Sequence, residues 1–196
     1  MKNFKSLAVL PWRMAFSYYM KTKVTTQQKK DAYKWAEWTV MCGGAFNRYN
    51  KNLQHQIDKH YIGKLGEIAF YNIATREGIM MDYDEIIKQK FKHDEYDFLM
   101  PNGDFKIDIK ACKPSHRYLL VPKNQIDRNK NKMDIYVAVV VDEESGAAEI
   151  KGYTWKKDLI KNTDEAVSTS MPDGENYNAK LSELKNIANI LSYWYF

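Results

Sequence analysis

Two aspartates and a lysine near the middle of the chain are the residues best suited to do chemistry. Asp97 precedes an Asn-Gly pair at 102–103, and Asp108 and Lys110 follow it. An Asn-Gly pair between two short strand-like runs predicts a β-hairpin. Carboxylates that a hairpin brings together require a cation, either Lys110 or a divalent metal such as Mg²⁺, Mn²⁺ or Ca²⁺. A solvated outer face of an ordinary hairpin is the alternative interpretation.

The register of this hairpin decides whether the two carboxylates meet. A turn of two or four residues places Asp97 directly opposite Asp108. The same register pairs Phe98 with Ile107, whereas a turn of three residues pairs Phe98 with Lys106. A shift of one residue exchanges the two faces of a strand, so the apolar pattern favours the first register. The apolar face of the second strand then consists of Phe105, Ile107, Ile109 and Ala111.

A third carboxylate, Glu67, lies upstream in a segment whose apolar residues recur at helical spacing. The predicted helix covers residues 58–76 and ends at Gly78. Gly63 and Gly66 are unusual inside a helix, and the pair predicts close packing against another backbone. Glu67 lies beside the packed stripe and can reach a site at the edge of a sheet. A surface glutamate paired with a lysine is the alternative.

The spacing of these residues resembles a known family signature. Asp97, ten intervening residues and Asp108-Ile109-Lys110 are similar to the motif of the PD-(D/E)XK nuclease superfamily. Tyr96 stands where the name of the superfamily has Pro, a departure that is common among its members. Segment 63–70, Gly-Lys-Leu-Gly-Glu-Ile-Ala-Phe, is similar to the helix that supplies an extra acidic metal ligand in many members. The resemblance covers roughly residues 56–155, in the superfamily's order of helix, hairpin and further strands.

The resemblance implies an α/β (α+β) fold of the restriction-endonuclease-like kind, with a mixed central sheet flanked by helices. It implies a Mg²⁺-dependent endonuclease that hydrolyses DNA phosphodiester bonds, with Mn²⁺ able to substitute. Glu67, Asp97, Asp108 and the backbone carbonyl of Ile109 would hold the metal. Lys110 would orient the attacking water or offset the charge of the phosphorane. Restriction-type, phage-encoded and repair or recombination nucleases all fit this description.

Other readings of the same residues remain open. One is a nucleic-acid-binding protein on this fold without catalysis, although the intact set of three carboxylates and Lys110 argues against it. Another is a nuclease that acts on RNA. Gln125 lies where some relatives place a polar residue near the site. Target sequence, nicking versus double-strand cleavage and the number of metal ions stay open, and so does oligomeric state, with a homodimer as one alternative.

The positive charge of the chain is concentrated at its N-terminal end. The net charge is +5, but residues 1–56 carry 10 Lys or Arg and 2 acidic residues, while the remainder carries 20 and 23. This excess predicts a surface that holds the DNA backbone without reading bases, and a solvated helical face is the alternative. Most of the interleaved aromatic residues are expected to pack helices together. The candidate phosphate contacts are Lys29, Lys30, Lys34, Arg48 and Lys51.

We expect the chain to divide into a basic, aromatic-rich helical extension over residues 1–56, packed on the core, and a PD-(D/E)XK-like nuclease core with a C-terminal helix over residues 57–196. Two cysteines with no metal-ligand spacing indicate free thiols in a reducing compartment. The apolar run at residues 7–10 is too short for a signal peptide or a membrane span. We therefore expect a cytoplasmic protein with no membrane partner.

Local patterns predict the elements that surround these residues. Thr25 or Thr26 is expected to cap a helix at 27–41, and a strand buried on both faces is expected at 134–141. Asn178 or Ser182 is expected to cap a C-terminal helix. Further helices are predicted at 12–20 and 45–56, a short helical turn at 155–160, strands at 118–121 and 148–154, and a loop at 162–177.

Overall fold

The computed structural model describes residues 20–42, 52–88, 96–100, 105–127, 132–169 and 175–191. Several expectations fall outside these ranges: nearly all of the helix at 12–20, most of the helix at 45–56, the hairpin turn itself, and the candidate phosphate contacts Arg48 and Lys51. Within the described ranges, every helix is too short or too polar to traverse a lipid bilayer.

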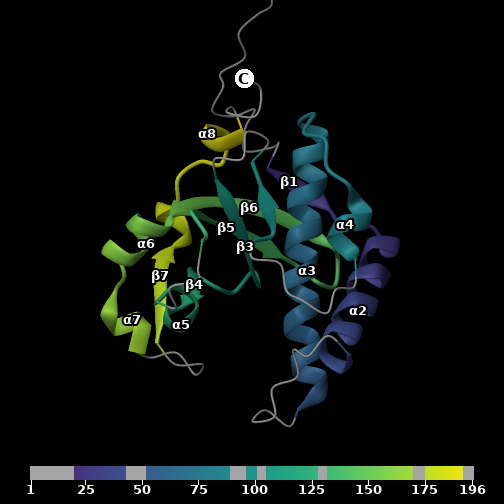
Figure 1. The fold of residues 1–196 in the computed structure, drawn as a ribbon, viewed down its shortest axis with the longest axis horizontal. Coiled ribbons are helices and arrows are strands. Elements are labelled where there is room, and N and C mark those ends of the chain that lie inside the picture. The colour runs from purple at the N-terminus through teal and green to yellow at the C-terminus, as the bar shows by residue number, and fades with distance from the viewer. Residues whose placement is uncertain are drawn as a thin grey trace, which may run out of the picture.

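A mixed five-stranded sheet forms the centre of the fold, in the order β1-β6-β5-β3-β2 (Figure 1). Only β3 and β5 run parallel, and every other neighbouring pair is antiparallel. The class is therefore mixed α+β, with helices flanking a mixed sheet as predicted. The strands are β1 (Lys21–Lys23), β2 (Phe98–Leu99), β3 (Lys106–Cys112), β5 (Ile135–Val141) and β6 (Ala147–Trp155).

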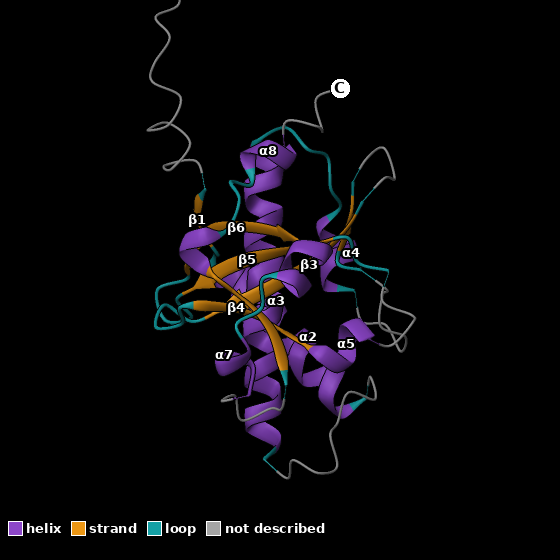
Figure 2. Ribbon diagram, turned by 90° about the vertical axis from the view of Figure 1, so that its left-hand side faces the viewer, coloured by secondary structure: helices purple, strands orange, loops and turns teal. Residues whose placement is uncertain are grey.

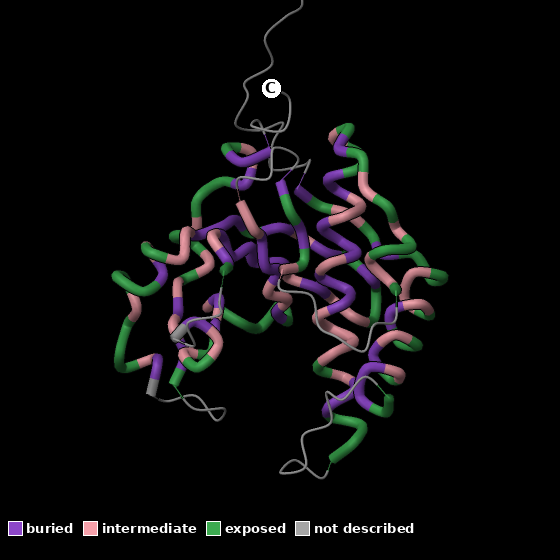
Figure 3. The backbone as a smooth tube through the Cα atoms, in the orientation of Figure 1, coloured by how far each residue is buried: buried purple, intermediate pink, exposed green. Residues whose placement is uncertain are grey.

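One face of the sheet is covered by α3 (Leu53–Arg76), the long helix in Figures 1 and 2, and α2 (Thr26–Met41) and α4 (Tyr83–Ile87) pack against α3. Apolar side chains of α3, including Leu65, Ile68 and Ile73, share one core cluster with the strands. Figure 3 shows the buried stretches along the central strands and α3. The long helix is therefore held against the sheet that carries Asp108.

The other face of the sheet meets a smaller group of elements. Strands β4 (Tyr118–Pro122) and β7 (Asn176–Lys180) form a separate antiparallel pair. Tyr136 and Ala138 of β5 join a second core cluster with β4, whereas Ile135, Val137 and Val139 belong to the first. The prediction that this strand is buried on both faces is confirmed. The remaining elements are α5 (Lys123–Asp127), α6 (Lys156–Lys161), α7 (Glu165–Thr169), the 3₁₀ turn η1 (Leu181–Glu183) and α8 (Ala188–Leu191).

Two glycines of α3 differ in what surrounds them. A Cβ on Gly66 would lie 2.7 Å from Cβ of Ala111 on β3, so the helix approaches the strand too closely for a larger residue. A Cβ on Gly63 would meet nothing within 4 Å. Close packing is therefore confirmed for Gly66 and wrong for Gly63. Gly78 follows the helix with φ +82°, the left-handed conformation that favours glycine at a helix end.

The N-terminal part of the described chain belongs to the sheet. Strand β1, which was not predicted, pairs with β6. The expected boundary between residues 56 and 57 lies inside α3, so no break separates extension and core at that point. Thr25 caps α2 as predicted: its Oγ1 accepts from the N–H of Gln28, and its own N–H donates to Gln28 Oε1.

The expectation of a C-terminal helix capped by Asn178 or Ser182 is wrong. Asn178 lies in β7 and its side chain is buried. Its Oδ1 accepts from the N–H of Asp164, and its Nδ2 donates to the carbonyl of Asp164. Pairing with β4 satisfies the backbone of residues 176–180 and draws them into a strand. Helix α8 is short, and the segment expected to be a loop at 162–177 contains α7.

Candidate active site

The predicted hairpin register is confirmed at Phe98, which pairs with Ile107. The N–H of Asp97 donates to the carbonyl of Ile107 at 3.0 Å, so Asp97 and Phe98 share one partner residue and the strand pairing does not continue to Asp108. The carboxylate of Asp97 accepts from the N–H of Ile109 at 2.6 Å through Oδ2. Asp97 is exposed to the cleft, and this bond orients its side chain along β3.

Asp108 is buried on β3 and has two neighbours of different chemistry. Its Oδ1 accepts from Gln125 Nε2 on α5 at 3.3 Å. Its Oδ2 lies 2.6 Å from Lys110 Nζ, as an ion pair without hydrogen-bond geometry. Among the described residues, this buried oxygen therefore has no hydrogen-bond donor. Gln125, which was predicted only as a polar residue near the site, lies in the structure at hydrogen-bond distance from Asp108.

Glu67 projects from α3 and pairs with Lys64, three residues earlier on the same helix. Lys64 is not among the predicted site residues. Its ammonium also donates to the carbonyl of Ile86 on α4 at 3.0 Å and lies 3.8 Å from the centre of the Trp35 ring on α2. The i, i+3 spacing to Glu67 was the one signal in the sequence that pointed to this pair.

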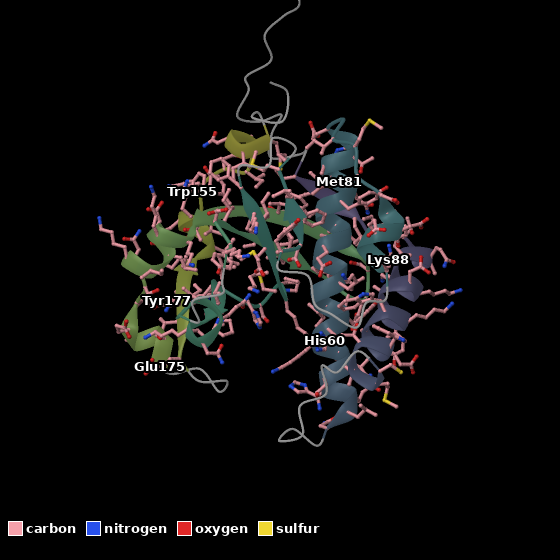
Figure 4. The ribbon with its side chains drawn as sticks, in the orientation of Figure 1. His60, Met81, Lys88, Trp155, Glu175 and Tyr177 are labelled. Carbon is pink, nitrogen blue, oxygen red and sulfur yellow. The ribbon has the colours of Figure 1, made fainter. Side chains whose placement is uncertain are left out.

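These side chains line a single cleft of about 920 Å³. We call the side formed by Asp97, Asp108 and Lys110 the strand wall. The side formed by Trp35, Lys64, Glu67 and Ile86 is the helix wall. Figure 4 labels three further lining residues, His60, Met81 and Lys88, on the side of α3 and α4. The charged lining residues are Lys64, Glu67, Asp82, Glu85, Lys88, Asp97, Asp108 and Lys110.

The charges of the cleft are unbalanced. Five carboxylates face three lysines, and among the described residues Asp97 forms no ion pair. The pKa of Asp97 is raised well above its ordinary value by desolvation, then by Glu67 and Asp108; the Ile109 N–H and Lys110 act in the opposite direction. Because Asp97 is open to the cleft, solvent reduces the effect of desolvation on its pKa. The charges of Glu67 and Asp108 still raise that pKa. Desolvation also raises the pKa of Glu67, against the effect of Lys64.

The carboxylates do not form a compact ligand group in this arrangement. In the part of the chain that the structure describes, no three His, Cys, Asp or Glu side chains are grouped closely enough to hold a metal ion. Glu67 is engaged by Lys64, and Asp97 by the backbone of Ile109. A metal would therefore have to draw these side chains together.

The lysines of α2 lie away from this lining. Lys29 donates to the carbonyls of Glu143 at 2.8 Å and Glu144 at 2.6 Å, in the turn between β5 and β6. Lys30 and Lys34 are exposed. The structure thus brings the carboxylates and Lys110 into one cleft, but it does not bring these lysines to its lining.

Comparison with known proteins adds no relative to this picture. Neither the family models, nor the curated proteins, nor the solved structures that were searched include a match to the chain.

Proposed function

We propose that the chain is a Mg²⁺-dependent endonuclease of the PD-(D/E)XK superfamily, with a restriction-endonuclease-like core, that hydrolyses DNA phosphodiester bonds in the cleft. The observation that carries the proposal is the convergence of Asp97, Asp108 and Lys110 with Glu67. Glu67 and Asp108 belong to different elements, α3 and β3, and they line the same cleft. The motif of the resemblance therefore has a spatial counterpart.

The donor set fits a hard divalent cation. Carboxylate and carbonyl oxygens are the ligands that Mg²⁺ prefers, and it needs few of them because it retains waters. Asp108 Oδ2 is buried and has the Lys110 ammonium at 2.6 Å as an ion-pair partner without hydrogen-bond geometry, and Asp97 has no cationic partner among the described residues. Asp97, Asp108 and the carbonyl of Ile109 would hold the ion, with Glu67 as an additional ligand. When bound, the ion supplies a Lewis acid for a phosphoryl oxygen and lowers the pKa of a coordinated water.

The side chains of the strand wall have distinct tasks in this proposal. Lys110 stands beside Asp108 and is partly exposed to the cleft, so its ammonium can donate to the attacking water or to a phosphate oxygen. A fixed cation next to developing negative charge lowers the barrier, most strongly where water is scarce. Gln125 orients Asp108 through Oδ1. Hydrolysis adds water across one P–O bond and leaves a phosphate on one fragment and a hydroxyl on the other.

A nucleic-acid-binding protein without catalysis is the second candidate. One observation favours it: the described carboxylates form no compact metal-ligand group. The two candidates differ in whether divalent cations enter the cleft and whether nucleic acid is cut.

The deciding experiment incubates the protein with supercoiled, linear and single-stranded DNA and with RNA, in Mg²⁺, Mn²⁺ or EDTA. We expect cleavage of DNA with either ion, none in EDTA, and none by Asp108→Ala under any condition. Binding of DNA by Asp108→Ala shows that this variant is folded. Binding without cleavage by the wild-type protein would establish the second candidate instead, and cleavage by Asp108→Ala at the wild-type rate would refute the assignment.

A further inference from the structure

Lys64 is the buried cation of the cleft, with only 5% of its surface exposed. A lysine at this depth is unusual unless every donor finds a partner. It lies on α3, and its contacts reach α2 through Trp35 and α4 through Ile86. Three helices of the helix wall therefore meet at a single ammonium group.

The ammonium of Lys64 is in contact with protein groups on all sides. It has three N–H donors. The carboxylate of Glu67 takes one, the carbonyl of Ile86 takes a second at 3.0 Å, and the Trp35 ring covers the group at 3.8 Å from its centre. A cation over the face of a tryptophan ring is a favourable contact. Lys64 therefore has no donor left for a phosphate oxygen, and its effect on chemistry must pass through Glu67.

The two walls each pair one lysine with one carboxylate. Lys110 pairs with Asp108, and Lys64 pairs with Glu67. The Asp108 oxygen beside Lys110 is in an ion pair without hydrogen-bond geometry, and the Lys110 side chain is partly exposed. Glu67, in contrast, is held on its own helix by a lysine that is itself fixed at three points. A divalent cation that recruits Glu67 has to displace this lysine from the carboxylate.

We propose that Lys64 is a positioning residue that competes with the divalent cation for Glu67 and thereby weakens metal binding by the resting protein. This inference rests on the proposed function. Glu67 leaves the ion pair when it joins Asp97 and Asp108, while the contacts of Lys64 with Ile86 and Trp35 keep the ammonium in place. The helix wall thus controls how readily the third carboxylate reaches the metal.

Replacing Lys64 with Met tests the competition. Methionine keeps an unbranched side chain against Trp35 and removes the charge that holds Glu67. We expect Mn²⁺ to bind Lys64→Met about fivefold more tightly than wild type, the size of a modest ion pair. Lys64→Gln, which keeps an N–H for the Ile86 carbonyl, is expected to tighten binding in the same direction and serves if the Met variant does not fold.

The control variants separate the proposed effect from a general change of charge. Lys88→Met removes a lysine that lines the same cleft and pairs with Glu85 at 2.6 Å, so it changes the charge without releasing Glu67. We expect it to change Mn²⁺ affinity less than Lys64→Met does. In a Glu67→Gln background, Lys64→Met is expected to have no effect beyond that of Lys88→Met, because the competition requires the carboxylate of Glu67.

The measurement is titration of the full chain with Mn²⁺ alone, by calorimetry, with circular dichroism to verify the fold of every variant. Unchanged or weaker Mn²⁺ binding by both Lys64 variants would overturn the inference. So would an equal gain in the Glu67→Gln background. In either case, Mn²⁺ binding by the wild type would leave the proposed function standing. If the wild type binds no Mn²⁺, the metal-dependent function and this inference both fail.

Discussion

On the strand wall, a paired strand fixes the backbone position of Asp108 and a backbone N–H holds the carboxylate of Asp97; on the helix wall, another side chain holds Glu67. Asp108 occupies β3, which is paired on both sides, and Asp97 accepts from a backbone N–H of the same strand. Glu67 is held by Lys64, whose own position depends on Trp35 and Ile86. A strand position can change only if the sheet changes, whereas a side-chain contact can be exchanged for another. We therefore expect the strand wall to carry the chemistry and the helix wall to adjust it.

The largest expected effect comes from the strand wall itself. Lys110→Ala should lower the rate of DNA cleavage by about 10²–10³-fold with little loss of DNA binding, because its cation acts on the water and the transition state. Lys106→Ala, on the same strand but outside the cleft lining, is the matched control and should keep most of the activity. The measurement is cleavage of plasmid DNA under single-turnover conditions. Equal losses of activity in both variants would show that Lys110 has no special role in catalysis.

The close approach of α3, which carries Glu67, to β3, which carries Asp108, is the next point to test. Gly66→Ala should destabilise the fold by about 1–3 kcal/mol, because the added Cβ would lie 2.7 Å from Cβ of Ala111. Gly63→Ala, three residues earlier on α3, should instead stabilise it by up to about 1 kcal/mol, since its surroundings are open and alanine favours a helix. Urea unfolding measures both. The same sign of change in the two variants would contradict the close approach of α3 to β3.

The pH dependence of stability tests the raised pKa of Asp97 on the strand wall. Because the pKa of Asp97 is raised in the folded protein, the folded state binds that proton more tightly than the unfolded state does. Its contribution to stability is complete below the unfolded pKa and is lost as pH rises through the folded pKa. Metal-free wild type should therefore lose stability over this range, and Asp97→Asn should lose less. Thermal unfolding at a series of pH values shows this difference, and identical profiles would rule it out.

The smallest expected effect concerns the surface outside the cleft. Lys30→Ala/Lys34→Ala should weaken DNA binding a few-fold and equally for unrelated sequences, and it should reduce the salt slope by up to about 2 if both lysines contact phosphates. Lys29→Ala should mainly affect stability, because its ammonium bonds the carbonyls of Glu143 and Glu144. Fluorescence anisotropy at several salt concentrations measures the slope. Unaltered affinity of the double variant at low salt would show that these charges are only a solvated face.

Local patterns in the sequence were sufficient to predict those elements whose residues are stabilised mainly by near neighbours in the chain. The alternation of apolar residues around Phe98 and Ile107 determined the hairpin register, and this hairpin brings Asp97 and Asp108 to one cleft. The capping residues of α2 and the continuous apolar run of β5 identified those elements for the same reason. In each case, neighbouring residues satisfy one another's hydrogen bonds or share one buried face, so the information lies within a few positions of the chain.

Only the tertiary structure decided the contacts between distant segments. Lys64 meets Trp35 and Ile86 because three helices converge, and no spacing in the sequence encodes that convergence. Strand β1 lies at the edge of the sheet because β6 offers it an unpaired edge, and β7 is a strand because β4 lies beside it. Strand pairing is a contact between partners, and a short polar segment such as 176–180 has no pattern that specifies its partner. The physical reason is that backbone hydrogen bonds of an edge strand are satisfied from outside its own segment.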